Sequence, residues 1–214
     1  MNRSAAYGAA ESALLTGSAG GGRGVAERRR RLTWVRTTGG PHLVVPQRYA
    51  ASWDGVDAPR RGRVVRAKFR YDPSGPATDY DRACDVAGWL GVIRVGRGSG
   101  LVLAGDVTVA AYYPWERKHY LLRWLCAPSE ASLLDHFHRV AGSLPVEEEV
   151  DFRHPGGKLV LMDSSDIPRE WCWPHAEFDL PAGRYRVSAS YSESEKVGLI
   201  VHRLRRRAGA GGRW

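Results

Sequence analysis

Short runs of β-branched and aromatic residues, separated by Gly and Pro turns, constrain the fold of this chain more than any other feature. They begin near Leu32 and continue to Leu204. Such runs are typical of consecutive β-strands. From Tyr185 to Tyr191 apolar and polar residues alternate, as in a strand with one face toward a core and the other toward water. The sequence therefore predicts an α+β fold that is mainly β and is built from antiparallel sheets.

We expect nine strands in this part of the chain. In one of them, Arg63–Tyr71, apolar residues alternate with Arg and Lys. That pattern predicts a half-exposed strand whose cationic face is solvated or protects a sheet edge. The expected strands are Leu43–Val45, Arg63–Tyr71, Gly91–Val95, Leu101–Leu103, Thr108–Tyr113, His119–Cys126, Leu159–Met162, Arg184–Tyr191 and Val197–Leu204.

One helix is clear in the sequence. Ser129 is a good N-cap, Glu130 suits the first turn, and Gly142 marks the end. Between them the apolar residues from Leu133 to Ala141 fall on one side of a helix. We therefore expect one clear helix that covers a face of a sheet.

The net charge of +9 lies at the two ends of the chain. Met1 to Arg31 holds six Arg against two Glu, and Arg203 to Trp214 holds five Arg and no acid. The remainder holds 21 basic and 21 acidic residues, which excludes a fold-wide basic groove, so nucleic acid is expected only through the tails. We predict a disordered leader over residues 1–31, a single globular domain over 32–204 and a basic disordered tail over 205–214.

The cysteines and the hydropathy pattern place the protein in the cytoplasm. Cys84, Cys126 and Cys172 are 42 and 46 residues apart and form no CxxC pair. This spacing favours reduced thiols over a disulfide framework. No stretch approaches the roughly 20 apolar residues that cross a bilayer, so we expect no membrane partner.

No spacing in the chain nominates a cofactor, a metal site or a catalytic group. Gly96–Gly100 resembles a phosphate loop, but an expected strand follows it where the dinucleotide motif needs a helix. His136 and His138 are two residues apart, whereas helical metal ligands need three or four. Cys172 and His175 have a ligand-like spacing without a second pair. We predict a protein that is not an enzyme and needs no cofactor or metal, with a small enzyme whose site lies near Cys172 and His175 as an alternative.

The segment from Tyr112 to Lys118 is a candidate for contact with a partner. It joins two expected strands and carries Tyr113, Trp115 and Arg117, residue types that are enriched at interface hot spots. Aromatic side chains that face inward into a core explain the segment equally well. Both interpretations stay open.

Asp79 and Asp81 lie on a short helical turn, because Thr78 and Asp81 have the spacing of a capping box. Positions i and i+2 point apart on a helix, so the two carboxylates do not form a general acid/base pair. A cap together with an ion pair to Arg82 is the favoured explanation. A patch that binds a partner is the alternative.

Several stretches between Leu32 and about Trp124 carry specific combinations of residues. They are Gly39-Gly40-Pro41 with Pro46, Trp53-Asp54-Gly55, Asp79-Tyr80-Asp81-Arg82-Ala83-Cys84, Gly96, Leu101-Val102-Leu103 with Gly105-Asp106, and Arg123-Trp124. In order and approximate spacing these stretches resemble the immunity protein 21 family of bacterial polymorphic toxin systems. The resemblance implies a protein that binds a cognate toxin and neutralises it, and it brings no catalytic residue.

The leading hypothesis is therefore an immunity protein whose partner is a toxin domain. We expect Tyr113, Trp115 and Arg117 to contact the toxin, with Asp79 and Asp81 second.

Two further hypotheses concern charge. The chain is alternatively a nucleic-acid-associated protein that binds phosphates through its Arg-rich tails. Within the immunity hypothesis, the acidic run Glu147–Glu149 with Asp151 is expected to attract a basic toxin, since charge complementarity speeds association.

Overall fold

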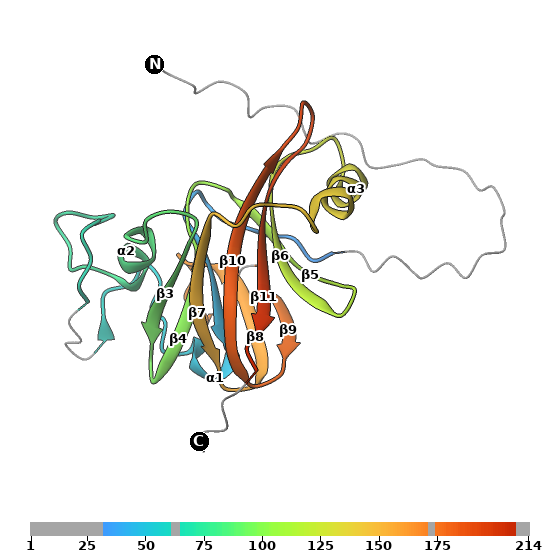
Figure 1. Ribbon diagram of the computed structural model, residues 1–214. Helices are drawn as coiled ribbons and strands as arrows, with labels where there is room; N and C mark the ends of the chain where they lie inside the picture. The colour runs from blue at the N-terminus through green and yellow to red at the C-terminus, as the bar shows by residue number, and fades with distance from the viewer. Residues whose placement is uncertain (1–31, 61–64, 171–173, 209–214) are drawn as a thin grey trace. The chain divides into compact units, whose positions relative to one another are not determined.

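The computed structural model describes residues 32–60, 65–170 and 174–208 (Figure 1). The expected leader, residues 1–31, lies outside them. Strands make up 44% and helices 13% of the structure, so β structure dominates. The predicted class is confirmed: the fold is mainly β, its sheets are antiparallel, and one longer helix covers a sheet face.

The larger sheet has six strands. They are β1 (Val35–Arg36), β5 (Val109–Trp115), β6 (Lys118–Cys126), β7 (Glu148–His154), β10 (Gly183–Glu193) and β11 (Gly198–Arg206). Their order is β1-β5-β6-β11-β10-β7. The hairpin β10–β11 pairs from Tyr185 opposite Arg206 to Glu193 opposite Gly198, which confirms the two predicted strands at the end of the chain.

The smaller sheet has five strands. They are β2 (His42–Pro46), β3 (Leu90–Val95), β4 (Gly98–Leu103), β8 (Gly157–Asp163) and β9 (Ala176–Leu180). Their order is β3-β4-β2-β8-β9. Gly96, with φ +54°, stands in the tight turn between β3 and β4, so the glycine-rich segment is a hairpin turn.

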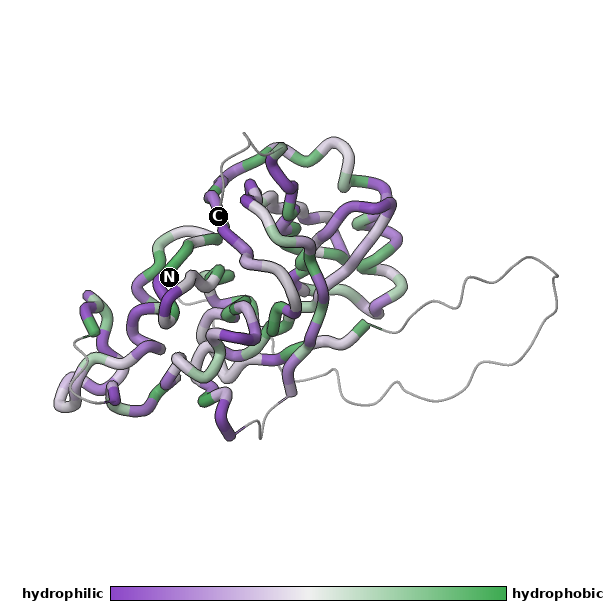
Figure 2. The backbone as a smooth tube through the Cα atoms, turned by 90° about the horizontal axis from the view of Figure 1, so that it is seen from below, coloured by the Kyte–Doolittle hydropathy of each residue, from purple (hydrophilic) through white to green (hydrophobic). Residues whose placement is uncertain are grey.

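The two sheets pack face to face around the main core. Alternate residues of both sheets meet there, as along the tube in Figure 2, which changes repeatedly between hydrophobic green and hydrophilic purple. The buried residues of this core are Val35, Val44, Leu90, Leu101, Leu103, Ala110, Leu121, Phe152, Leu159, Leu161, Ala176, Phe178, Leu180, Tyr185, Val187, Ala189 and Leu204.

Each sheet is also covered on its outer face. Helix α3 (Glu130–Val140) packs Leu133 and Phe137 on the outer face of the larger sheet. Helix α1 (Gln47–Ala50), helix α2 (Asp79–Cys84) and Trp53 cover the outer face of the smaller sheet. The helices α2 and α3 therefore lie on opposite sides of the two sheets (Figure 1).

The predicted helix starts are confirmed. The Ser129 side chain accepts a hydrogen bond from the Ser132 N–H and caps α3. At α2 the Thr78 and Asp81 side chains form a capping box.

The predicted strand Arg63–Tyr71 is wrong in its described part. Arg63 lies outside the described residues, and residues 65–71 form no strand. The Tyr71 N–H instead donates to the Asp81 carboxylate, with 2.5 Å between nitrogen and oxygen. Alternation of apolar and polar residues is not sufficient for a strand, because a strand also needs a neighbouring strand to pair with, and residues 65–71 have none.

Three strands were not expected: β1, β7 and β9. In β7 the acidic residues hid the pattern, because Glu and Asp are depleted in strands. The last strand, β11, runs through Arg206, beyond the expected domain end at Leu204.

A cationic centre lies buried among the strands. Arg123 of β6 has no exposed surface and donates to the carbonyls of Ala104, Gly105 (2.9 Å) and Val107 (2.7 Å). His42 and His202 are also fully buried. Burial and the Arg123 charge lower the pKa of His42 to about 3 and hold the pKa of His202 well below its usual value, so both rings are neutral in the folded protein at neutral pH.

We predict that these histidines make the protein sensitive to acid. The unfolded chain takes up their protons below pH 6.5 while the folded chain does not, so the free energy of unfolding falls as pH falls from about 6.5 toward 4. Each histidine contributes a slope of about 1.4 kcal/mol per pH unit. In urea denaturation across this range, His202→Leu should lower the slope by about that amount. Equal slopes in His202→Leu and in the wild-type protein would contradict the prediction.

Candidate functional site

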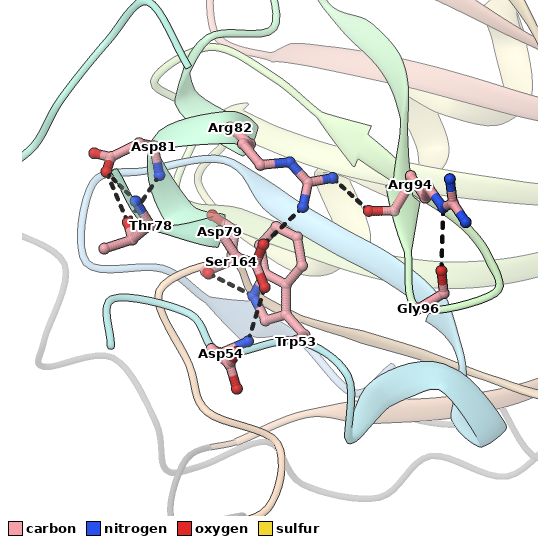
Figure 3. Close-up of polar contacts among 9 residues, drawn as sticks. All are labelled: Trp53, Asp54, Thr78, Asp79, Asp81, Arg82, Arg94, Gly96 and Ser164. Atoms are coloured by element: carbon pink, nitrogen blue, oxygen red, sulfur yellow. Dashed lines mark hydrogen bonds and ion pairs between the residues drawn. The ribbon is translucent and has the colours of Figure 1, made fainter. Parts of the chain in front are cut away.

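A network of buried polar groups ties α2 to the smaller sheet (Figure 3). The Asp79 carboxylate accepts hydrogen bonds from the Asp54 N–H (3.0 Å) and from Arg82 Nη1 (2.7 Å). Arg82 also donates to the Arg94 carbonyl on β3, and its guanidinium lies 5.9 Å from the ring centre of Trp53. The Trp53 indole N–H donates to the Ser164 carbonyl after β8 (2.9 Å). The six-residue helix is thus fixed directly to β3 and to the Trp53–Asp54 segment, which is itself bonded to the end of β8.

Asp81 holds the loop before α2. Its carboxylate accepts from the Thr78 N–H (2.6 Å), from the Thr78 hydroxyl (2.9 Å) and from the Tyr71 N–H (2.5 Å). Asp79 and Asp81 are each 1% exposed. The expected cap and the expected ion pair between Asp79 and Arg82 are confirmed. Contact of these two carboxylates with a toxin stays a prediction, and in this structure both face inward.

Between the two aspartates of α2, the half-buried Tyr80 lines two clefts. The first cleft has a volume of about 450 Å³ and the second about 340 Å³, and Tyr80 lines both. The Tyr80 N–H donates to the Gly55 carbonyl (3.0 Å), and a Cβ on Gly40 would lie 2.5 Å from the Tyr80 hydroxyl. Only glycine at position 40 leaves room for this ring.

The first cleft lies between the Tyr80 ring and the loop after β8. Its charged residues are Arg36, Asp163, Asp166 and Glu170. Burial and the neighbouring Asp163 raise the pKa of Asp166 to about 6. The cleft is therefore lined by both acidic and aromatic side chains.

The second cleft lies over the β4–β5 connection. Gly39, Gly40, Pro41, Ala104 and Gly105 line it. Arg123 binds the Ala104 and Gly105 carbonyls from the interior, so the buried guanidinium supports the floor of this cleft. Burial raises the pKa of the Cys84 thiol on its wall, which disfavours the nucleophilic thiolate.

Exposed apolar side chains gather at these clefts. Val56 and Tyr71, 44% and 68% exposed, line the first cleft, and Phe69, 45% exposed, lines the second. Tyr71 stands edge-on to Tyr80 with 5.7 Å between ring centres. Sequence reasoning missed Val56, Phe69 and Tyr71 as site residues, because it treated the last two as members of a strand.

The structure places Tyr113, Trp115 and Arg117 on the other outer face, beside α3. Tyr113 and Trp115 lie on β5, half-buried, with ring centres 5.5 and 5.4 Å from that of Phe137. Glu116 and Arg117 form the two-residue turn to β6 with φ of 48° and 58°, and Arg117 is exposed. Both aromatic side chains pack against α3 and are also partly exposed. The core interpretation and the partner-contact interpretation of this segment therefore both retain support. It does not join the Tyr80 clefts.

The acidic run is paired within the protein. Arg186 donates to Glu149 and to Asp151, at 2.9 Å in each case, and the Trp89 N–H donates to Glu148 (2.7 Å). Arg186, together with Arg207 beside Asp151 (3.2 Å), offsets two of the four negative charges of the run. This weakens the expected attraction for a basic toxin.

Within residues 32–60, 65–170 and 174–208, no three His, Cys, Asp or Glu side chains lie together as a metal site would need. In the same residues no helix has the length and apolarity to span a membrane. Cys172 lies outside the described residues, so the alternative enzyme site near Cys172 and His175 is not tested.

We predict that Asp79 stabilises the fold through the Arg82 pair. Asp79→Asn removes the charge and leaves a partly buried guanidinium without its carboxylate, which should lower the free energy of unfolding by about 3 kcal/mol. The matched control is Asp57→Asn, because Asp57 forms an exposed pair with Arg169 (2.7 Å) and should cost about 1 kcal/mol or less. Urea denaturation measures both, and equal losses would contradict the assignment.

Known proteins were compared with the chain, and one family matches the region that holds the sequence motifs around these clefts. Neither the curated proteins nor the solved structures yield a match. The immunity protein 21 family matches residues 33–197, well over half of the chain. That range contains α2, both clefts and the Arg123 support. The chain belongs to the immunity protein 21 family, and is thus an immunity protein of a toxin system.

Proposed function

We propose that this protein neutralises its cognate toxin by binding it at the two clefts that flank Tyr80. The observation that carries the proposal is the clustering of exposed apolar side chains. Of the five large hydrophobic residues exposed in the described part of the chain, Val56, Phe69 and Tyr71 line these clefts. Patches of this kind mark interaction sites, and Tyr is enriched at binding hot spots.

The surroundings of the clefts suit a preorganised interface. The Asp81 carboxylate fixes the Tyr71 backbone, and the Asp79–Arg82 pair fixes the helix that carries Tyr80. Binding to such a surface costs little ordering of the chain, so more of the contact energy contributes to affinity.

Inhibition by occlusion also fits the chemistry of the clefts. Immunity protein families are generally not catalysts. Burial raises the pKa values of Tyr80 and Cys84, so both groups stay protonated at neutral pH. They offer contact surface and hydrogen bonds, and neither is an activated nucleophile.

Tyr113, Trp115 and Arg117 form a second candidate surface, which we call the α3 surface. Its support is the partial exposure of Trp115, which lies between His138 (ring centres 5.1 Å apart) and Lys118 (5.7 Å from the ring centre). Because α2 and α3 lie on opposite sides of the sheets, substitutions can separate the two surfaces.

The first test is co-expression of the full chain with the toxin domain encoded next to its gene, scoring host survival and co-purification. Survival with a stable complex supports neutralisation by binding. Death of the host without a complex contradicts it. A variant that lacks residues 1–31 and carries Arg205→Gln, Arg206→Gln, Arg207→Gln and Arg213→Gln tests the nucleic-acid alternative and keeps the length of β11. Binding of nucleic acid through the tails should be lost while neutralisation persists.

We predict that Tyr71→Ala weakens the Kd for the toxin about tenfold or more, as expected for a hot-spot aromatic. Phe69→Ala should act in the same direction. Since both side chains are largely exposed, the melting temperature should change little. Affinity is measured by surface plasmon resonance.

Val146→Ala, 55% exposed and outside the clefts, is the matched control and should keep the wild-type affinity. Trp115→Ala decides between the two surfaces. A large loss in Trp115→Ala with none in Tyr71→Ala would move the contact to the α3 surface.

A further inference from the structure

The first cleft combines three features that call for a cationic occupant. It is a concavity of about 450 Å³, it has the Tyr80 and Tyr71 rings on its wall, and it carries carboxylates on the loop after β8. In the part of the chain that the structure describes, no side-chain hydrogen bond or ion pair reaches the Asp166 or Glu170 carboxylates. These carboxylates are therefore available to a ligand.

The charges around Asp166 leave a local excess of negative charge. Partial burial raises the pKa of Asp166, and repulsion from the neighbouring Asp163 carboxylate adds to the effect. Asp163 itself is held by the Thr38 N–H (2.8 Å) and the Ser165 N–H (2.9 Å). Among the described residues that line the cleft, Arg36 supplies the one positive charge, so this part of the lining carries two more negative than positive groups.

A cation that enters the cleft relieves this repulsion. The free protein keeps like charges together at a partly buried site, which costs free energy. A positive group between Asp166 and Glu170 offsets that cost. It also restores the charged form of Asp166, since an opposite charge lowers the pKa of a carboxylate.

We infer that the first cleft binds an arginine side chain presented by the protein partner. The planar guanidinium stacks on aromatic rings and pairs with carboxylates through two parallel N–H groups. A cleft lined by Tyr71, Tyr80, Asp166 and Glu170 offers both kinds of contact. A lysine ammonium fits less well because it does not stack as a plane. The inference rests on the proposed function for the identity of the partner, but the cleft itself can be tested without the toxin.

The test without toxin uses the peptide acetyl-Gly-Arg-Gly-amide and the full-length protein. Two-dimensional NMR at low salt and pH 7.5 follows the backbone amides during titration. We expect saturable shifts confined to the cleft, at Asp166, Glu170 and Tyr80. Absence of saturable shifts, or equal binding of acetyl-Gly-Glu-Gly-amide or acetyl-Gly-Lys-Gly-amide, overturns the inference.

Variants assign the effect to the carboxylates of the cleft. Asp166→Asn and Glu170→Gln should each weaken peptide binding about fivefold, the size expected for one partly exposed ion pair. Glu195→Gln, at an exposed carboxylate outside the cleft lining, is the matched control. The inference fails when the control weakens binding as much as the cleft variants. Asn has nearly the same shape as Asp, and Asp166→Asn removes the repulsion from Asp163. We therefore expect this variant to keep the fold.

The pH dependence provides an independent readout. The groups around Asp166 are Asp163, Glu170, Arg36, Tyr71 and Tyr80. The pKa of Asp166 near 6 means that acidification from pH 7.5 to 5 neutralises it and weakens binding of the arginine peptide. In Asp166→Asn this extra loss should disappear. Identical pH profiles in both proteins contradict the inference.

The toxin complex then separates the two proposals. If the toxin binds and the cleft variants leave its Kd unchanged, the arginine inference is overturned and the proposed function stands. If no toxin complex forms, the proposed function fails, and the peptide titration alone decides whether the cleft accepts arginine.

Discussion

Burial of both faces of both sheets is the constraint on which the rest of the structure depends. The inner faces meet in the main core, so each outer face needs a cover of its own. All five residues of β2 are buried for this reason. The larger sheet is covered by α3, an eleven-residue helix with an apolar side. The smaller sheet has only short covers, α1 and α2, which are too short to be stable alone.

The polar network around α2 follows from that shortness. Asp79, Arg82 and Trp53 connect the helix to β3 and to the end of β8. Hydrogen bonds to charged groups each contribute about 1.5–3 kcal/mol, so they replace part of the apolar contact that a longer helix would make. These bonds fix the helix that carries Tyr80, and the Asp81 carboxylate of the same helix holds the Tyr71 backbone beside it. Stability of the cover and definition of the binding surface thus have one physical origin.

Much of the fold follows from local sequence patterns, whereas the clefts do not. Alternation located β10, and Ser129 and Thr78 marked both capped helices. The same alternation misled at Arg63–Tyr71, because a strand also needs a partner and Asp81 takes the Tyr71 N–H.

The site escaped local reasoning for a related reason. Val56, Tyr71 and Asp166 come from segments far apart in the chain, and no spacing connects them. The motif residues could be recognised in the sequence, but most of them, such as Asp79 and Arg123, lie beneath the clefts and support them from the interior. The prediction for Asp79 illustrates this: its loss should be measured as stability before it is measured as binding.

The folded body has no net charge, but its carboxylates are of two kinds: some are paired with arginines and others are not. Glu149 and Asp151 look like an electrostatic feature in the sequence, yet Arg186 already pairs with both. Such pairs must be broken before a partner can use them, and an exposed pair gains little when it is exchanged for another. Asp166 and Glu170 attract no attention in the sequence, but they line a cleft, and no cation among the described residues pairs with them. Recognition depends on charges that the fold leaves uncompensated, so the carboxylates most useful to a partner are the ones that folding did not pair.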